Sequence, residues 1–312
     1  MKKKAFIVSI FLIILFSFAP NMMNVNANES NDIIGYSIDS NRNESFLYEN
    51  DLHSSMRNYT DSTIDNVFFE DVETTNQNNG SRAIIDDDNR VILKDYQYTQ
   101  QPYRSICRIV ITFNEISNVA FQGTGFLVGP HTILTNCHVL YDCSNDHNYG
   151  WFDTISISFG TYKNSNGEII NPYGTITQFT YASCGSFRDT GNVNDDWALL
   201  DLNVNIGNEL GYFGVTAESN DNDSVRVVGY SGDLDRKMAY SNGVIFNVNT
   251  YKFDHNCDVY SGGSGSPVIK NSNNLVCGIH SGYSYYWFFG DHYTNHACKI
   301  SNYIVAWVEE RL

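Results

Sequence analysis

The feature that most constrains the fold of this chain is a series of short apolar or alternating runs separated by polar turns. The runs are brief and rich in the β-branched and aromatic residues that favour strands. They lie at residues 106–113, 125–128, 132–134, 154–159, 197–202, 224–230, 243–248, 267–269 and 275–280. Asn-Gly pairs at 166–167 and 242–243 are typical of hairpin turns. Together these features predict an all-β, antiparallel barrel or sandwich from about Tyr103 onward.

The end of the chain follows a helical period instead. Between residues 301 and 312 the apolar side chains recur at helical spacing, and Ser301 can cap the first turn. We therefore expect a C-terminal helix that closes the β domain.

The N-terminus has the pattern of an export signal. Lysines at 2–4 precede an apolar run at 5–19, and Val25-Asn26-Ala27 places small residues at the two positions that a signal peptidase reads. No later run approaches the ~18 apolar residues that a membrane span needs. These features predict a signal peptide at 1–27 and a secreted, extracellular protein that has no membrane attachment once the signal is removed.

The next segment, 28–82, is polar and rich in Asn, Asp, Glu and Ser, with weak periodicity. Residues 74–81 predict a flexible link, and Arg82 then precedes the apolar Ala83-Ile84-Ile85. A basic residue at the end of such a link is typical of a processing site. We therefore expect a propeptide at 28–82, removed after Arg82, and a mature domain at 83–312.

Charge and cysteine content exclude some classes of protein. With 35 acidic and 19 basic residues, the formal net charge of −16 argues against a nucleic-acid partner. Seven cysteines leave at least one thiol unpaired, and no CxxC pair supports a zinc ribbon. Export permits disulfide bonds, and Cys137 and Cys143 are close enough in sequence to suggest a local one. We expect a monomer.

Three short patterns carry candidate chemistry. The segment Thr135-Asn-Cys-His138-Val ends a strand pair in a histidine, and Asp196 directly precedes the apolar strand Trp197-Ala-Leu-Leu. Taken singly, such a histidine is more often structural, and such an aspartate more often caps a turn. However, a carboxylate drawn toward the interior needs a hydrogen-bond partner such as an imidazole N–H.

The third pattern is Gly262-Gly-Ser264-Gly-Ser-Pro-Val. Glycines on both sides of a serine allow a tight turn whose amide N–H groups converge, and such donors stabilise a developing oxyanion by roughly 3–4 kcal/mol each. A Gly/Ser linker is the alternative, but a linker would not run directly into an apolar strand. The order His, Asp, Ser in an exported all-β chain favours nucleophilic catalysis by Ser264.

These three patterns resemble those of the chymotrypsin-like serine proteases, and more closely the bacterial glutamyl endopeptidase branch. Further similarities lie at 102–106, 171–174 and 207–214, so that the resemblance covers about residues 83–312. It implies two six-stranded antiparallel β-barrels with a C-terminal helix and an active site between the barrels. It also implies protein or peptide substrates, with no cofactor and no metal.

The resemblance assigns roles to the candidate residues. His138, Asp196 and Ser264 correspond to the catalytic triad, with Asp195 as the runner-up for the acid. The backbone N–H groups of Gly262 and Ser264 correspond to the oxyanion hole. Gly263 occupies the position where vertebrate members carry an acid that pairs with the new N-terminus, so that mode of activation is not expected. The disulfide that some Bacillus-type members form has neither half here, because its positions hold Gly123 and Val139.

The same resemblance implies an S1 pocket that accepts glutamate. His280 corresponds to the histidine that meets the P1 carboxylate, and the α-amino group of Ala83 would assist it. Both lose positive charge as pH rises, so the preference should then weaken. Ser281, Gly282 and Tyr283 correspond to the edge strand that pairs with the substrate backbone. Val259 replaces a Thr or Ser of the family, which should weaken carboxylate binding by ~1.5–3 kcal/mol.

Three functions therefore stay open. The favoured one is an endopeptidase that prefers Glu at P1, with Asp as an alternative acidic P1 residue. The others are an active protease with an apolar P1 preference and a catalytically silent binding protein on a protease fold.

Overall fold

The computed structural model describes residues 33–48, 84–85, 87–116, 119–142, 149–187, 193–286 and 292–312, all within the unit Asp32–Leu312. The expected signal peptide, Arg82 and Ala83 lie outside these residues, and so does most of the expected propeptide. The signal, the cleavage site and the mature N-terminus therefore stay predictions. Within the described part of the chain, no helix combines the length and apolar character needed to cross a membrane.

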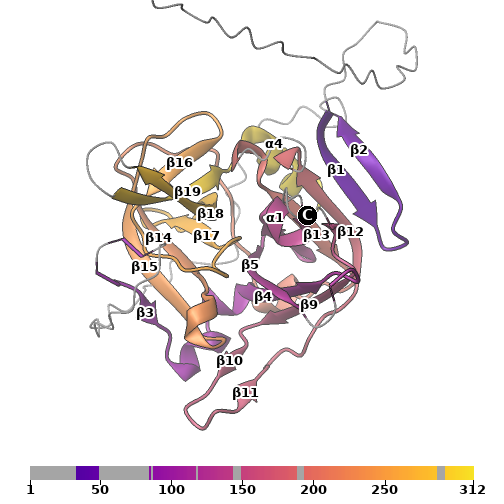
Figure 1. The fold of residues 1–312 in the computed structure, drawn as a ribbon, viewed down its shortest axis with the longest axis horizontal. Helices are drawn as coiled ribbons and strands as arrows, with labels where there is room; N and C mark the ends of the chain where they lie inside the picture. The colour runs from indigo at the N-terminus through magenta and orange to yellow at the C-terminus, as the bar shows by residue number, and fades with distance from the viewer. Residues whose placement is uncertain are drawn as a thin grey trace, which may run out of the picture. The chain divides into compact units, whose positions relative to one another are not determined.

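Six antiparallel strands form the first barrel, in the order β12-β13-β6-β5-β4-β9 (Figure 1). They are β4 Ile106–Thr112, β5 Phe121–Leu127, β6 Thr132–Thr135, β9 Thr154–Phe159, β12 Phe179–Gly185 and β13 Ala198–Leu202. An isolated bridge between Ile157 and Ile176 joins β9 to the segment before β12. Because strand side chains alternate between faces, Ile109 and Ile111 of β4 pack in the same buried cluster as Ile133 and Leu200.

The second barrel follows the order β14-β17-β18-β19-β16-β15, and pairing of β15 with β14 closes it. Its strands are β14 Ser224–Tyr230, β15 Met238–Phe246, β16 Lys252–His255, β17 Pro267–Lys270, β18 Val276–Tyr286 and β19 His292–Lys299. The short strand β3, Val91–Ile92, pairs with β15 at the edge.

A third buried cluster joins the barrels to helix α4, Asn302–Glu309. It contains Phe126 of the first barrel, Ile279 of the second and Trp307 of α4. The Ser301 side chain accepts a hydrogen bond from the Ile304 N–H at 3.3 Å and so caps the helix, as the sequence predicts. The fold expected from the sequence, two antiparallel barrels followed by a helix, is confirmed.

Several short elements complete the described chain. They are α1 Cys137–Leu140, α3 Gly207–Leu210, β7 Tyr141–Asp142, β8 Gly150–Trp151, β10 Tyr162–Lys163, β11 Ile169–Ile170, and the 3₁₀ turns η2 Asp95–Thr99, η3 Tyr103–Ser105, η4 Val193–Asp195 and η5 Gly232–Leu234. The hairpin predicted at 166–167 is confirmed, since β10 and β11 flank Gly167, whose φ is +82°.

The prediction of a hairpin turn at residues 242–243 is wrong. Asn242 and Gly243 lie inside β15 and pair with β14. This strand passes from β14 to β16 along its length. Gly243 is needed there for close approach rather than for a turn, because a Cβ would lie 2.4 Å from Asn256 Oδ1.

The sequence analysis missed a hairpin inside the expected propeptide. Strands β1, Ile33–Asp39, and β2, Glu44–Tyr48, extend the first sheet beyond β12 (Figure 1, indigo). The segment looked polar because only a few of its side chains, among them Tyr36, Ile38 and Leu47, are buried.

The suggested Cys137–Cys143 disulfide cannot be placed, because Cys143 lies outside the described residues. Five other cysteines, Cys107, Cys184, Cys257, Cys277 and Cys298, are buried and carry no disulfide.

Candidate active site

His138 stands on the short helix α1, immediately after strand β6. The preceding Asn136 is buried, and its side-chain N–H groups donate to the Asp196 carbonyl at 2.6 Å and to Ser281 Oγ at 3.0 Å. These bonds tie the start of α1 to the residues around Asp196. Asn136 belongs to the Thr-Asn-x-His motif, although the sequence did not indicate what its side chain does.

Asp196 is 1% exposed and is the carboxylate in contact with His138. Its Oδ1 accepts the backbone N–H of His138 at 3.0 Å, and its Oδ2 lies 2.7 Å from His138 Nδ1. Its Oδ2 also accepts a hydrogen bond from Ser281 Oγ at 2.7 Å. Three donors therefore compensate the burial of this charge. Of the two candidate acids, Asp196 is therefore the one that the structure places against the ring.

The contact with Asp196 fixes the state of the His138 ring. A carboxylate accepts hydrogen bonds, so Nδ1 carries the proton and Nε2 keeps a free lone pair when the ring is neutral. Burial acts to lower the pKa of His138, but the charge and hydrogen bond of Asp196 outweigh it and raise that pKa above its ordinary value of 6.5. The arrangement therefore favours a proton acceptor whose charged form is stabilised.

Ser264 sits in the turn that leads into β17, and the peptides around it have fixed directions. The Ser261 carbonyl accepts from Gly232 N at 2.7 Å, and the Gly263 carbonyl accepts from Ser266 N at 3.0 Å. Because C=O and N–H of one peptide point in opposite directions, the N–H groups of Gly262 and Ser264 point away from these partners. Within the described chain neither N–H donates a hydrogen bond to another group. Gly262 has φ +93°, so this turn requires glycine.

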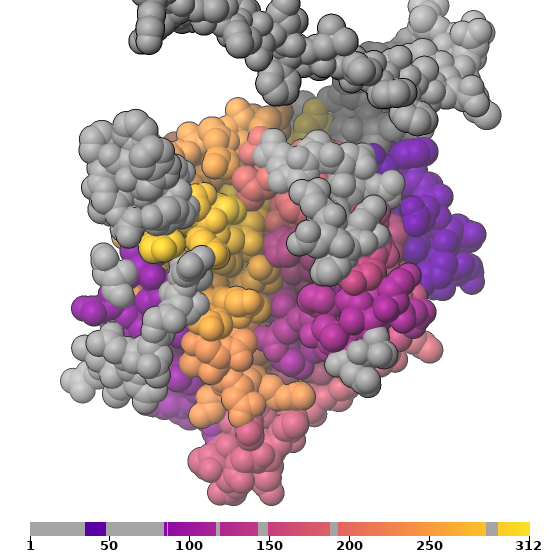
Figure 2. Space-filling model, viewed as in Figure 1, coloured from indigo at the N-terminus to yellow at the C-terminus, as the bar shows by residue number. Residues whose placement is uncertain are grey.

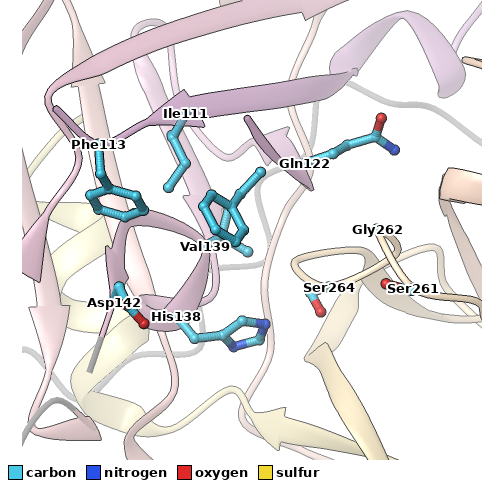
Figure 3. A pocket seen from close by; sticks show the side chains of 10 residues that line it. Ile111, Phe113, Gln122, His138, Val139, Asp142, Ser261, Gly262 and Ser264 are labelled. Atoms are coloured by element: carbon cyan, nitrogen blue, oxygen red, sulfur yellow. The ribbon is translucent and has the colours of Figure 1, made fainter. Parts of the chain in front are cut away.

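His138 and Ser264 line the same pocket, of about 280 Å³ (Figure 3). Its other described lining residues are Ile111, Phe113, Phe121, Gln122, Val139, Asp142, Ser261 and Gly262. In this structure Ser264 Oγ donates to the Ser281 carbonyl at 3.4 Å, a long hydrogen bond. The structure thus brings together the predicted histidine, aspartate and serine, and places both predicted N–H donors beside the serine.

His280 is buried on β18 and contacts a second histidine that the sequence analysis missed. His280 Nδ1 lies 3.1 Å from Nε2 of His255, which is fully buried on β16. Burial lowers the pKa of His255 to about 3, and burial together with His255 lowers the pKa of His280 well below 6.5. This lowering argues against the expectation that His280 contributes positive charge to the S1 pocket, a charge whose loss with rising pH should weaken the preference for glutamate. Nothing in the spacing of the two residues signals their contact, because different strands bring them together.

Ser281, Gly282 and Tyr283 continue β18 past a register shift between His280 and Gly282. Strand β17 pairs with β18 only as far as Ile279, so beyond that point one edge of β18 has no partner among the described strands. Such an edge can pair with an extended peptide. Tyr283 is 44% exposed, and the side chain of Ser281 turns inward to Asp196.

Val259 is buried behind the nucleophile turn. Its Cγ1 would lie 2.3 Å from a Cβ on Gly263, so the two residues are packed as closely as a glycine allows. Val259 also lines a small cavity together with Asp258, Gly263 and Ser266. The Val259 side chain therefore packs against the nucleophile turn, in addition to any role in a substrate pocket.

Asp258, next to Val259, was not singled out from the sequence. It is 3% exposed and accepts the backbone N–H of Ile85 at 2.8 Å and of Asn89 at 2.7 Å. It therefore anchors the segment just after the expected cleavage site to the chain that precedes Ser264. Burial raises the pKa of Asp258 above its usual value, against the effect of these two hydrogen bonds.

The described residues contain no group of three or more His, Cys, Asp or Glu side chains that could hold a metal ion.

This chain is similar to known proteins in sequence and in fold. The chain is 33% identical over 195 residues to a glutamyl endopeptidase of Bacillus licheniformis, a match that covers 62% of this chain and 56% of that protein. It is also 29% identical over 219 residues to an extracellular metalloprotease of Bacillus subtilis, covering 68% and 66% respectively. The chain thus spans just over half to two thirds of the length of these relatives.

A solved structure of a Glu endopeptidase in complex with MPD superposes with a TM-score of 0.59 at 24% identity, over 73% of this chain and 98% of that one. This likeness supports the chymotrypsin-like fold. The profile of the trypsin-like peptidase domain matches residues 123–279, a range that contains His138, Asp196 and Ser264. Because this match spans half of the chain, the protein belongs to the trypsin-like peptidase family, with the chymotrypsin-like serine protease fold.

Proposed function

We propose that this chain is a secreted serine endopeptidase that cleaves after glutamate and becomes active when residues 28–82 are cut off. The observation that carries the proposal is the 2.7 Å contact of His138 with buried Asp196, in a pocket that also holds Ser264. The N–H groups of Gly262 and Ser264, which donate to no other group among the described residues, supply the second requirement, a site for an oxyanion. A binding protein would need neither feature.

The mechanism follows from these positions. Rotation about the Cα–Cβ bond of Ser264 moves its O–H from the Ser281 carbonyl toward Nε2 of His138. As Oγ attacks the substrate carbonyl carbon, His138 takes the proton and Asp196 stabilises the imidazolium that forms. The carbonyl oxygen gains negative charge and accepts hydrogen bonds from the backbone N–H groups of Gly262 and Ser264.

Collapse of this intermediate breaks the peptide bond. His138 gives its proton to the leaving amine, and an acyl-enzyme remains on Ser264. Water then enters, His138 accepts one of its protons, and the hydroxide attacks the ester. The acid product leaves and the proton returns to Ser264 Oγ, so the enzyme is restored.

Glutamate preference rests on His280 and on the amino group that processing creates. If the Nε2–H of His255 donates to Nδ1 of His280, a neutral His280 carries its own proton on Nε2. That Nε2–H can donate a hydrogen bond to the carboxylate of the substrate. The positive charge would then come from the α-amino group of Ala83. Glutamate should exceed glutamine because an unpaired charged group in the pocket costs more than a neutral contact gains.

A second candidate specificity is supported by the same observations. Burial lowers the pKa of His280 well below 6.5, and the Val259 side chain offers only carbon atoms, so an S1 pocket formed by these two residues would also suit an apolar P1 residue. A protease with this preference is the alternative function.

The experiment is to measure kcat/KM on matched peptides with Glu, Asp, Gln, Leu or Phe at P1. We expect Ser264→Ala to lower kcat by about 10⁶ and Ser266→Ala, its matched control in the same turn, to keep most activity. His280→Ala should reduce the Glu/Gln ratio, and Val259→Thr should raise it. Wild-type preference for Leu or Phe would support the alternative, whereas residual activity in Ser264→Ala would contradict the mechanism.

Processing after Arg82 is tested separately, by N-terminal sequencing of the secreted active form. We expect it to begin at Ala83 and the Arg82→Gln precursor to stay inactive. An active form that starts far from Ala83 would remove the amine from the specificity argument and leave Ser264 chemistry untouched.

A further inference from the structure

The hairpin of β1 and β2, residues 33–48, belongs to the segment that processing would cut from the domain. It nevertheless forms part of the first sheet. Strand β1 pairs antiparallel with β12 from Gly35 opposite Gly185 to Asp39 opposite Tyr181. Just past the strand, the Ser40 N–H donates to the Thr180 carbonyl at 3.1 Å. This is the geometry by which an added strand binds the edge of a sheet.

Burial shows that the hairpin is packed and not merely adjacent. Tyr36 is 7% exposed and Ile38 3%, and both lie in the core cluster of the first barrel. Leu47 of β2 is 5% exposed and packs in the cluster that joins both barrels to α4. Removing these side chains would therefore expose apolar surface of both clusters to water.

Two details fit the hairpin to its place on the domain, one on β12 and one outside that strand. Gly35 lies so close to β12 that a Cβ would be 2.2 Å from the Cys184 carbonyl oxygen. At the other end, the Arg42 guanidinium lies 5.2 Å from the centre of the Phe152 ring and donates to the Asp153 carbonyl at 2.5 Å. The hairpin thus has a close backbone fit at one end and a cation–π contact at the other.

We propose that the edge of β12 that pairs with β1 is a strand-docking site and that residues 33–48 stay bound to it after the chain is cut behind them. The active protein is then a noncovalent complex of the domain and its own propeptide fragment. This rests on the proposed removal of residues 28–82. None of the described residues that line the pocket of His138 and Ser264 belongs to the hairpin, so retention leaves that pocket open. Figure 2 shows the hairpin (indigo) as a ridge on the side of the molecule.

Retention also has a consequence for the site. Gly185, at the end of β12, donates its N–H to the Trp197 carbonyl at 2.9 Å, and a Cβ on it would lie 2.2 Å from the Asp195 carbonyl oxygen. The hairpin therefore braces the strand that packs directly against the residues on both sides of Asp196. Its loss should lower thermal stability, and it should affect the chemistry only through that packing.

The test uses the full chain in a Ser264→Ala background, with a site for a sequence-specific protease inserted between Asn79 and Gly80. After cutting, the sample is passed over a native size-exclusion column and each peak is weighed by intact mass spectrometry. We expect the fragment with residues 33–48 to co-elute with the domain in equal amounts and to separate only in urea. Its removal should lower the Tm of the domain by about 10 °C.

Two variants distinguish docking on β12 from nonspecific adhesion. Gly35→Val places a side chain against the Cys184 carbonyl and should release the fragment on the native column. Phe46→Ala is the matched control, because Phe46 is 51% exposed on the same hairpin, and its fragment should be retained. If the wild-type fragment separates without denaturant, or if Gly35→Val retains it as well as wild type does, the proposal is wrong. Since the inserted site is cut independently of Arg82, failure of the processing proposal would appear only in N-terminal sequencing.

Discussion

At the scale of single residues, the site depends on how Asp196 holds the His138 ring. Hydrogen bonds from Ser281 Oγ and from the backbone N–H of His138 orient the carboxylate, and the carboxylate in turn selects the tautomer. Only the neutral ring can accept the proton of Ser264. The charge of Asp196 therefore raises the pKa of His138 and so determines the pH at which catalysis begins.

We expect kcat/KM to rise with pH through the pKa of His138, with a midpoint above 6.5. Asp196→Asn removes the charge that raises this pKa, so the midpoint should move to lower pH while kcat falls by about 10⁴. The measurement is a profile from pH 5 to 9 on a substrate with a neutral P1 residue, which separates His138 from the charged groups of the S1 pocket. Asp195→Asn is the control and should keep the wild-type midpoint. A wild-type midpoint below 6.5 would contradict the assignment of Asp196.

At the scale of elements, the pocket beside the site is formed by β4, β5 and α1. Ile111 lies on β4, Phe121 on β5 and Val139 on α1, and all three line the same pocket as His138. Figure 3 shows Ile111 and Val139 beside this space. His138 protonates the leaving amine, so the peptide that follows the cleaved bond must lie on its side of the site. These elements therefore present an apolar surface to the leaving group.

We expect wild type to favour peptides with Leu or Phe after the cleaved bond over peptides with Ser there. Phe121→Ala should lower kcat/KM for the apolar series by about 3- to 10-fold, because it removes partly exposed aromatic contact area, and should change the Ser series little. The internal control is the Glu/Gln ratio at P1, which depends on β18 and should not move. An equal loss on both series would show that Phe121 acts on folding or on the triad and does not bind the leaving group.

At the scale of the whole molecule, the buried histidines link stability to pH. His255 and His280 are kept neutral in the fold, whereas in the unfolded chain each binds a proton near pH 6.5. As pH falls below 6.5, the unfolded state therefore gains protons that the folded state does not, and stability is lost. His138 acts in the opposite direction, because its raised pKa stabilises the fold in acid, so it offsets part of this loss.

We expect His255→Gln to lose less thermal stability than wild type when pH falls from 7.5 to 5.0. The variant lacks one group that protonates on unfolding, worth about 2 kcal/mol over the 1.5 pH units below 6.5. The comparison is the difference in Tm between the two pH values for each protein, which cancels any constant cost of the substitution. Equal differences would mean that His255 is protonated in the fold.

Much of this protein is encoded locally in its sequence. Strand positions follow from alternation of apolar residues, the helix at 302–309 from its period and its Ser301 cap, and the nucleophile turn from glycines that no other residue could replace. Neighbouring residues produce these features, so they can be predicted without knowing what packs against them. The order His138, Asp196, Ser264 could be recognised for the same reason, because each residue lies in its own short motif.

Contacts between distant strands could not be predicted in this way. His255 meets His280 because β16 and β18 flank β19. Asp258 accepts the N–H of Ile85, which lies 173 residues earlier in the chain, and Ser281 turns to Asp196 where the barrels meet. The hairpin at 33–48 was missed because it becomes a pair of strands by binding the edge of β12. The burial and the charge state of these residues depend on which side chains and strands they contact. Those contacts form only when the chain has folded, because the contacting residues are far apart in the sequence.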